Sequence, residues 1–189
     1  TTLAFGLLVW WRVPETRPDE AAVRSRVVNP FRQFSVALRD VRLVVITLLW
    51  LAVGIIMFQA YTTLPLAMQQ EGLIEADYGA SIALNGLVIV VISIPVAAWA
   101  TRRPRYLIMA GATMLWAAGF GVYVFAEGSL LIYMFGVVTW TLGELTTTPV
   151  GNALVSDIAP IELRGTYMGV VGTSWGMSAA LAPIIGGKI

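Results

Sequence analysis

The sequence predicts an all-α integral membrane protein, and two observations lead to that fold class. Of its 189 residues, 58% are hydrophobic and 12% are charged, whereas soluble domains carry about 25% charged residues. Five apolar stretches also reach the length of roughly 20 residues that a helix needs to cross a bilayer. We expect membrane spans at approximately residues 43–68, 78–100, 106–125, 130–155 and 166–187.

The placement of arginine predicts how these spans are oriented. Eleven of the 12 Lys and Arg residues lie in the segments on one side of the expected membrane, whereas the two opposing loops, 69–77 and 126–129, hold carboxylates and no basic residue. Such a bias marks the arginine-rich side as cytoplasmic. We therefore expect a multi-pass protein of the cell (inner or plasma) membrane, in contact with the lipid bilayer. The eleven residues are Arg12, Arg17, Arg24, Arg26, Arg32, Arg39, Arg42, Arg102, Arg103, Arg105 and Arg164.

Residues 13–42 form the one long polar stretch of the chain. Its first half has the composition of a flexible linker, and Asn29 and Pro30 then make a helix-start signal. The apolar side chains that follow fall on one helical face, which is typical of an amphipathic helix at a membrane surface. Because the membrane explains the dispersed arginines, we expect no nucleic-acid partner. The apolar residues of this face are Phe31, Phe34, Leu38 and Val41.

Glu144 is the one charged residue well inside a predicted span. A carboxylate at that depth is costly by a few kcal/mol or more, so it indicates either a functional site or a buried pair. On a helix it belongs to a polar and aromatic stripe that suits a protein neighbour or a water-filled cavity better than lipid. Two interpretations stay open, a proton-carrying group and a hydrogen-bonded packing group. The stripe consists of Tyr133, Val137, Trp140, Thr141, Glu144, Thr147, Thr148 and Gly151, with Asn152 beside it.

A second polar cluster precedes Pro65 in the first predicted span. Its side chains could line a substrate cavity, or they could hydrogen-bond between helices, where such contacts contribute about 0.6 kcal/mol in membranes. The sequence leaves both alternatives open. The cluster consists of Gln59, Tyr61, Thr62 and Thr63.

Charged residues at the expected cytoplasmic ends of the spans form a third candidate group. Asp157 closes one span and Arg164 opens the next, so an ion pair or a helix cap between them is expected. Such a pair could act as a gate or as a plain anchor, and Arg102 and Arg105 are further candidates in the neighbouring loop.

Glycines and prolines inside the spans predict features of helix packing. Small residues at every third or fourth position of the last span allow close helix approach. Prolines within spans remove a backbone hydrogen bond and predict kinks. The glycines are Gly165, Gly169, Gly172 and Gly176, and the prolines are Pro65, Pro95, Pro149 and Pro183.

The chain has no cysteine and no histidine. It therefore lacks thiolate nucleophiles, imidazole bases and the usual zinc ligands, and one intramembrane carboxylate cannot by itself form a hydrolytic site. We expect that the protein is not an enzyme and that it binds no metal and no cofactor.

Four segments carry a resemblance to a known family. Residues 157–165 hold an Asp–two–Pro–three–Arg–Gly spacing that resembles the loop between spans 10 and 11 of the major facilitator superfamily, closest to its drug/proton antiporter branch. Residues 59–66 are similar to span 7 of that branch, and residues 182–187 to the Gly-Pro-x-x-Gly-Gly element of span 11. Residues 101–105 are similar to the C-terminal copy of the signature loop, but Thr101 replaces the acidic residue that forms a latch in the family.

The resemblance implies a twelve-span fold of which this sequence holds the C-terminal part. Residues 1–12 would be the end of span 6, residues 13–42 the central cytoplasmic loop, and residues 43–189 the C-terminal six-helix bundle, truncated after span 11. Spans 1–5 and span 12 are expected outside the sequence. The N-terminal half of the same protein is then an expected partner.

The resemblance also implies a function. Spans 7 and 10 line the central pathway in this superfamily, so we expect a secondary active transporter that works by alternating access. The leading hypothesis is proton-coupled efflux of small amphiphilic or drug-like substrates, with Glu144 as the proton-coupling residue. A sugar or metabolite uniporter or symporter, and a sensor or scaffold that does not transport, stay open as alternatives.

Overall fold

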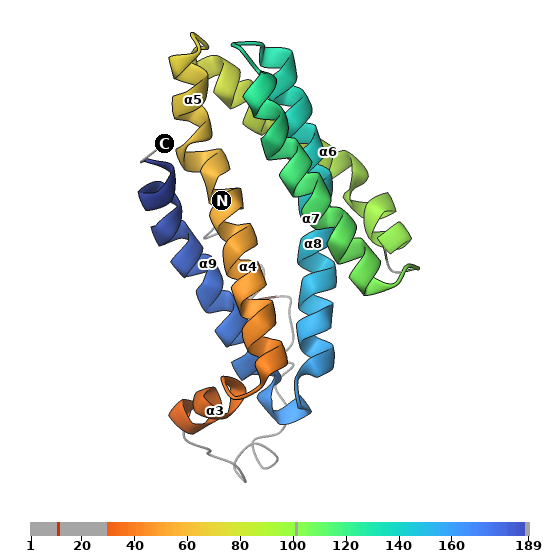
Figure 1. Cartoon of the computed structure of the whole chain (residues 1–189). Helices are drawn as coiled ribbons and strands as arrows, with labels where there is room; N and C mark the ends of the chain where they lie inside the picture. Colours follow the sequence, from red (N-terminus) through yellow and green to blue (C-terminus); the bar gives the residue numbers. More distant parts are fainter. Residues whose placement is uncertain (1–10, 12–29, 101, 188–189) are drawn as a thin grey trace. The chain divides into compact units, whose positions relative to one another are not determined.

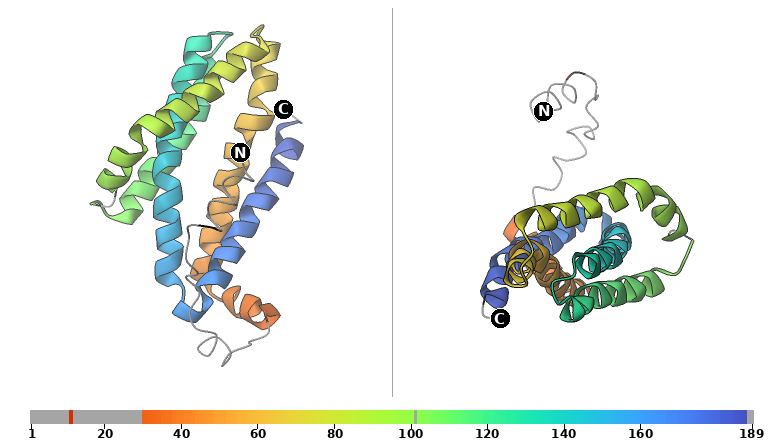
Figure 2. Two further views of the ribbon diagram at one scale, coloured as in Figure 1. Left: turned by 180° about the vertical axis from the view of Figure 1, so that it is seen from behind. Right: turned by 90° about the horizontal axis from the view of Figure 1, so that it is seen from above.

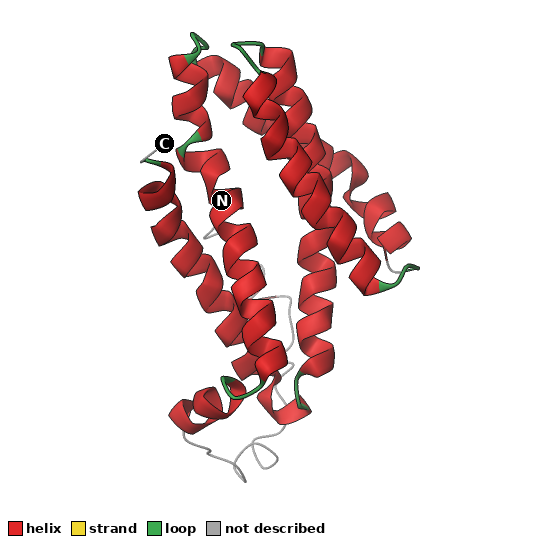
Figure 3. Cartoon of the chain, viewed as in Figure 1, coloured by secondary structure: helices red, strands yellow, loops and turns green. Residues whose placement is uncertain are grey.

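The computed structural model describes Trp11, residues 30–100 and residues 102–187. These residues form helices and connecting turns, without a strand among them (Figure 1, Figure 3). The expected end of a span at residues 1–12 and the first half of the loop at 13–42 lie outside the described residues, apart from Trp11. The elements are α3 (Pro30–Ala37), α4 (Val41–Thr62), α5 (Leu64–Gln70), α6 (Glu75–Ala100), α7 (Arg105–Gly121), η2 (Val122–Phe125), α8 (Leu130–Ile158), η3 (Ile161–Leu163) and α9 (Arg164–Gly186).

Among the described residues, five helical segments are long and apolar enough to cross a membrane, which confirms the predicted fold class. Each overlaps one expected span, but the first ends at Thr62 instead of residue 68, and the last begins at Ile161 instead of residue 166. The second begins earlier than expected, because Glu75 and Asp77 join its first turn, where carboxylates are favoured by the helix dipole. The segments are Val41–Thr62, Glu75–Ala100, Arg105–Phe125, Leu130–Ile158 and Ile161–Gly186.

The first predicted span is not one continuous helix. α4 ends at Thr62, and α5 begins at Leu64 with Pro65 in its first turn. Because proline has no backbone N–H, it cannot donate to the carbonyl four residues earlier, and the helix is interrupted where that bond is lost. The other prolines lie inside helices that remain continuous: Pro95 in α6, Pro149 in α8 and Pro183 in α9.

Two sets of helices make up the part of the chain from residue 34 onward. α4 packs along α9, and α8 packs along α6 on one flank and α7 on the other. The two sets are joined by smaller contacts of α8 with α4 and α9 (Figure 1, Figure 2). In this part of the chain the arginines lie where α4, α7 and α9 begin and where α6 ends, at the same end as the last turn of α8, and we call this the arginine-bearing end. α8 is therefore the helix that contacts most of the others.

The close contact between α7 and α8 depends on glycine. A Cβ atom on Gly119 would lie 2.7 Å from the backbone nitrogen of Trp140 and 2.9 Å from the carbonyl oxygen of Gly136. These distances are too short for any side chain, so the two backbones touch directly. The glycines expected to bring helices together in the last span do not do so among the described residues. A Cβ atom on any of the four would meet nothing within 4 Å there, and they are Gly165, Gly169, Gly172 and Gly176.

We predict that Gly119→Ala separates α7 from α8 and destabilises the protein. Overpacking of a tight contact costs about 1–3 kcal/mol, because the methyl group would meet backbone atoms that cannot move aside. Thermal unfolding of the detergent-solubilised protein measures the effect. Gly111→Ala in the same helix is the matched control, since a Cβ there meets nothing within 4 Å. Equal unfolding temperatures for the two variants would contradict the prediction.

Candidate functional site

Glu144 lies half-buried on α8, facing α6. The side-chain amide of Asn85 on α6 donates one hydrogen bond to Glu144 Oε2 at 3.2 Å and another to Thr141 Oγ1 at 3.0 Å. Thr141 is fully buried and donates in turn to the carbonyl of Val137 at 2.6 Å. The intramembrane carboxylate therefore has a specific partner on a neighbouring helix.

A small pocket of about 290 Å³ lies beside Glu144, between α6 and α8. Glu144 and Thr148 line it from α8, together with the ring of Pro149. From Glu144 it extends toward the arginine-bearing end, because the lining residues of α6 all follow Asn85 in the chain. The α6 residues of this pocket are Ile89, Ser93 and Ala97. Of the predicted stripe, Glu144 and Thr148 are thus the residues that face an open space together.

Two aromatic residues of the stripe occupy the core instead of the expected cavity. Tyr133 and Trp140 are each 1% exposed, because Tyr133 packs against Leu64 and Met68 of α5 and Trp140 packs against Trp116 of α7. The Trp140 ring stacks on Trp116 with 5.5 Å between centroids, and its indole N–H donates to the Tyr123 hydroxyl at 2.9 Å. The expectation that Tyr133 and Trp140 line a substrate cavity is corrected, and both act as packing groups in this structure.

The polar cluster before Pro65 contacts α9. The Gln59 amide donates to the carbonyl oxygen of Ala182 at 3.2 Å, and the Thr63 hydroxyl donates to the Gln59 side-chain oxygen. The Thr62 hydroxyl bonds its own helix, at the carbonyl of Phe58. Gln59 therefore bonds across to α9, whereas Thr63 bonds Gln59, four residues earlier in the chain, and a role of the cluster in a substrate cavity stays a prediction.

Tyr61 differs from its neighbours in that cluster. Tyr61 is 45% exposed, and no hydrogen bond of its hydroxyl is found among the described residues. Asn152, two turns beyond Glu144 on α8, is also exposed. Tyr61 on α4 and Asn152 on α8 are therefore the members of their predicted groups that stay accessible beside Thr148.

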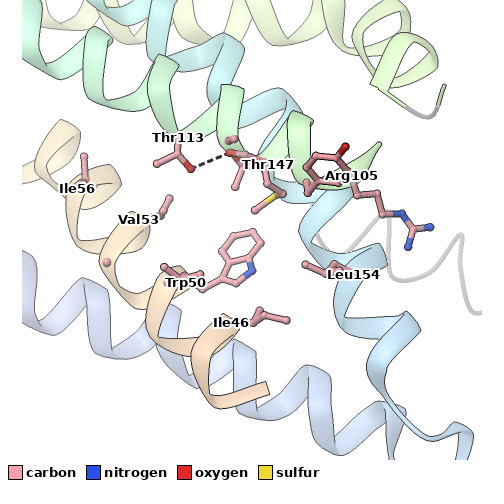
Figure 4. A pocket seen from close by; sticks show the side chains of 13 residues that line it. Ile46, Trp50, Val53, Ile56, Arg105, Thr113, Thr147 and Leu154 are labelled. Atoms are coloured by element: carbon pink, nitrogen blue, oxygen red, sulfur yellow. Dashed lines mark hydrogen bonds between the residues drawn. The ribbon is translucent and has the colours of Figure 1, made fainter. Parts of the chain in front are cut away.

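A larger, apolar pocket of about 490 Å³ lies between α4, α7 and α8 (Figure 4). Thr147 and Thr113 line it, but each hydroxyl bonds a carbonyl of its own helix, Gly143 at 2.7 Å and Met109 at 2.9 Å. Arg105 lies at its arginine-bearing end. Thr147 was expected on the same surface as Glu144, whereas the structure places the two in different pockets.

The ion pair of Asp157 is with Arg105, at the first residue of α7, rather than with Arg164. Arg164 begins α9 and is exposed, and Arg102 is exposed in the turn after α6. The pair between Asp157 and Arg164 that the short loop suggested is thus corrected. The physical reason is that α7 packs along α8, which brings its first residue against the last turn of α8.

Asp40 is a further residue of this end that the sequence reasoning did not identify. It caps α4 by accepting the Arg42 backbone N–H at 3.0 Å, and it accepts the Tyr167 hydroxyl of α9 at 3.1 Å. A side-chain hydrogen bond from Arg42 holds the pKa of the Asp40 carboxyl below its ordinary value of 3.8, against the opposing effect of burial. An aspartate directly before an apolar run is a helix-cap signal, so the sequence did contain the information.

Asn85 was also missed, and here the sequence offers little signal. An uncharged amide inside a span is common enough in interhelical contacts that it does not mark a site. Only the packing of α6 against α8 shows that it faces Glu144.

Among the described residues, five segments able to span a membrane and a hydrogen-bonded carboxylate within one of them indicate a multi-pass α-helical membrane protein. The sequence model of the Major Facilitator Superfamily matches residues 1–183. The chain belongs to this superfamily.

Curated relatives agree with this assignment. The chain is 29% identical over 191 residues to the uncharacterized MFS-type transporter YqjV of Bacillus subtilis, a match that covers 97% of this chain and 45% of that protein. It is 21% identical over 110 residues to a Na(+), Li(+), K(+)/H(+) antiporter of Planococcus maritimus, covering 58% and 26%. It is 29% identical over 85 residues to the uncharacterized MFS-type transporter YdeE of Escherichia coli, covering 45% and 21%. The chain thus spans less than half the length of these relatives. No solved structure matches it.

We predict that the charge of Asp40 contributes to stability in a defined pH range. Because its folded pKa lies below 3.8, the contribution is present above pH 3.8 and is lost as the pH falls through the folded pKa. Asp40→Asn keeps a capping side chain but removes the charge. The unfolding temperature of the wild type should therefore exceed that of the variant above pH 3.8, and the difference should shrink below it. A difference that is constant with pH would show that the charge plays no part.

Proposed function

We propose that the protein is a proton-coupled secondary transporter that exports small amphiphilic molecules across the cell membrane. The observation that carries this proposal is the Glu144 carboxylate, half-buried within a span, bonded to Asn85 and open to a pocket. A charged group inside a span is expensive, and taking up a proton removes that charge. Protonated and charged Glu144 therefore favour different surroundings.

The pocket beside Glu144 supports an amphiphilic substrate. It has the carboxylate at one end and apolar side chains along its walls, including Ile89, Ala97 and Leu145. A molecule with a positive charge and an apolar body could pair its charge with the carboxylate and pack its body against the apolar walls. Substrate and proton would then compete for the same carboxylate, and competition for one site makes transport an exchange of the two.

Other accessible polar groups near the pocket extend this substrate path. Thr148 lines the pocket itself, while Tyr61 and Asn152 are exposed on α4 and α8. We assign these three side chains to contacts with substrate. Tyr133, Trp140 and Gln59 take no part in it, because each is occupied in packing or in hydrogen bonds between helices.

Alternating access needs a surface along which two bundles can move. The glycines of α9 at 165, 169, 172 and 176, together with Gly79 and Gly86 of α6, leave open space within 4 Å of where a Cβ would lie, among the described residues. Such smooth surfaces allow close sliding contact with another bundle. We propose that this bundle is the N-terminal half of the same protein, and that the two rock around the site.

We predict that Glu144→Gln abolishes proton coupling, because an amide cannot take up the proton. The complete protein is reconstituted into vesicles that contain a pH-sensitive dye, and a lipophilic cation is added as substrate. Proton movement should fall to the level of empty vesicles. Glu127→Gln, which changes an exposed carboxylate in a loop, is the matched control and should behave as wild type. Wild-type coupling in a folded Glu144→Gln protein would overturn the proposal.

A second candidate function is exchange of a monovalent metal cation for protons. The relative from Planococcus maritimus is described as a Na(+), Li(+), K(+)/H(+) antiporter, and it matches 58% of this chain. The same vesicles distinguish the two. Proton movement driven by Na⁺, Li⁺ or K⁺ but not by the organic cation would favour this candidate. In a sugar or metabolite porter, neither the metal cations nor the organic cation would drive proton movement. In a sensor or scaffold that does not transport, no solute would drive it.

We predict that the pair between Arg105 and Asp157 acts in gating at the arginine-bearing end. Both side chains are about half exposed, so losing the pair should change stability by less than about 1 kcal/mol. Transport should respond more strongly, because the pair ties α7 to α8. Arg105→Asp and Asp157→Arg should each lower the transport rate, and the double swap should restore it. Equal rates in all three variants would identify the pair as an anchor without a gating role.

A further inference from the structure

Asn85 is placed to control the candidate proton site, although it carries no charge itself. Its side chain is 7% exposed, and its amide nitrogen serves both Glu144 Oε2 at 3.2 Å and Thr141 Oγ1 at 3.0 Å. An amide group has two N–H donors, so both bonds can exist at once. α6 thus reaches the carboxylate through one residue.

The orientation of the amide follows from Thr141. The Thr141 hydroxyl donates its hydrogen to the carbonyl of Val137 at 2.6 Å, which leaves its oxygen free only to accept. Asn85 must therefore direct its NH₂ group, and not its carbonyl oxygen, toward the Thr141 hydroxyl. Because the same NH₂ group also contacts Glu144, the Glu144 carboxylate receives an N–H donor from Asn85.

A donor prefers the charged form of a carboxyl group. The N–H of Asn85 bonds well to a carboxylate oxygen, whereas a carboxylic acid with its proton on that oxygen cannot accept in the same way. Taking up a proton thus weakens the contact from α6 to α8, and releasing it restores the contact. The protonation of Glu144 and the strength of the α6–α8 contact therefore depend on each other.

We propose that Asn85 is a positioning residue that holds the Glu144 carboxylate at the head of the α6–α8 pocket and makes proton uptake loosen the α6–α8 contact. This inference rests on the proposed function of Glu144 as the proton carrier. It adds Asn85 as the residue whose hydrogen bond depends on the protonation of Glu144, and the α6–α8 contact as the one that changes with it.

Few other groups compete with Asn85 for this role. On α4, Tyr61 is the titratable residue that interacts with Glu144. The α6 residues that line the pocket, Ile89, Ser93 and Ala97, do not ionise near neutral pH. On α7, Arg105 is engaged by Asp157 at the arginine-bearing end.

Labelling by a hydrophobic carbodiimide tests the proposal without relying on transport. This reagent adds to protonated carboxyl groups and leaves carboxylates unmodified, and mass spectrometry of the peptides locates the product at Glu144. The complete protein is labelled in lipid vesicles over a range of pH. In Asn85→Leu, labelling of Glu144 should extend about 1 pH unit further into the alkaline range, the effect of losing one hydrogen bond to a charged group.

Two further variants separate positioning from general damage to the fold. Thr141→Val preserves shape but frees the Asn85 amide to turn, so it should extend labelling in the same direction by a smaller amount. Ser81→Ala is the matched control, since Ser81 is a buried polar residue of α6, one turn before Asn85, whose hydroxyl donates to the carbonyl of Asp77 in the same helix. It should leave the labelling curve unchanged.

The outcomes distinguish this inference from the proposed function. A wild-type labelling curve in both Asn85→Leu and Thr141→Val would overturn the positioning role, even where Glu144→Gln abolishes proton coupling. An equal extension of labelling in Ser81→Ala would also overturn it, because loosening of α6 would then be the cause. If Asn85→Leu extends labelling while Glu144→Gln retains coupling, the positioning of the carboxylate stands and the transport role of Glu144 falls.

Discussion

Hydrocarbon offers no hydrogen-bond partners, and this constraint organises the polar groups of the whole bundle. Most hydroxyl groups within the spans satisfy it locally, by donating to a carbonyl three or four residues earlier in the same helix. Thr47, Thr62, Thr113, Thr139, Thr146, Thr147 and Thr173 are of this kind. Such bonds lower the cost of burial, but they do not select a neighbouring helix. Selection falls to side chains that reach further, which are chiefly the amides of Gln59 and Asn85.

The helix pairs consequently differ in what holds them together. α4 and α9 are joined by hydrogen bonds from Gln59 and Ser178 to backbone carbonyls. α7 and α8 are joined by steric fit, with Gly119 against the backbone of α8 and Trp116 stacked on Trp140. α6 and α8 are joined through Asn85 and an ionisable group, Glu144. Of these three contacts, the last responds directly to a proton, while the steric one holds its geometry regardless of charge.

The sequence predicts the outline of the fold and part of the site. Apolar length locates the five spans, and the rarity of charge inside them identifies Glu144, because both follow from transfer to hydrocarbon. The stripe around Glu144 predicts a single surface, but α5 covers Tyr133 and α7 covers Trp140, while Thr147 and Thr148 open onto different pockets. A helical stripe identifies residues that avoid lipid without stating which neighbour they meet. Proximity in the chain likewise suggested Arg164 for Asp157, whereas helix packing supplies Arg105.

By itself, the sequence determined which five stretches of the described residues are long and apolar enough to span a membrane, which helix ends carry arginine, and which carboxylate lies within a span. These are properties of individual segments in their solvent, and each can be read from one stretch of residues. Only the tertiary structure decided that Asn85 meets Glu144, that Gln59 meets α9, and that the aromatic side chains fill the core. Those outcomes depend on which helices lie side by side and at what rotation, and that choice is made by the fit of glycines, amides and rings across helix contacts.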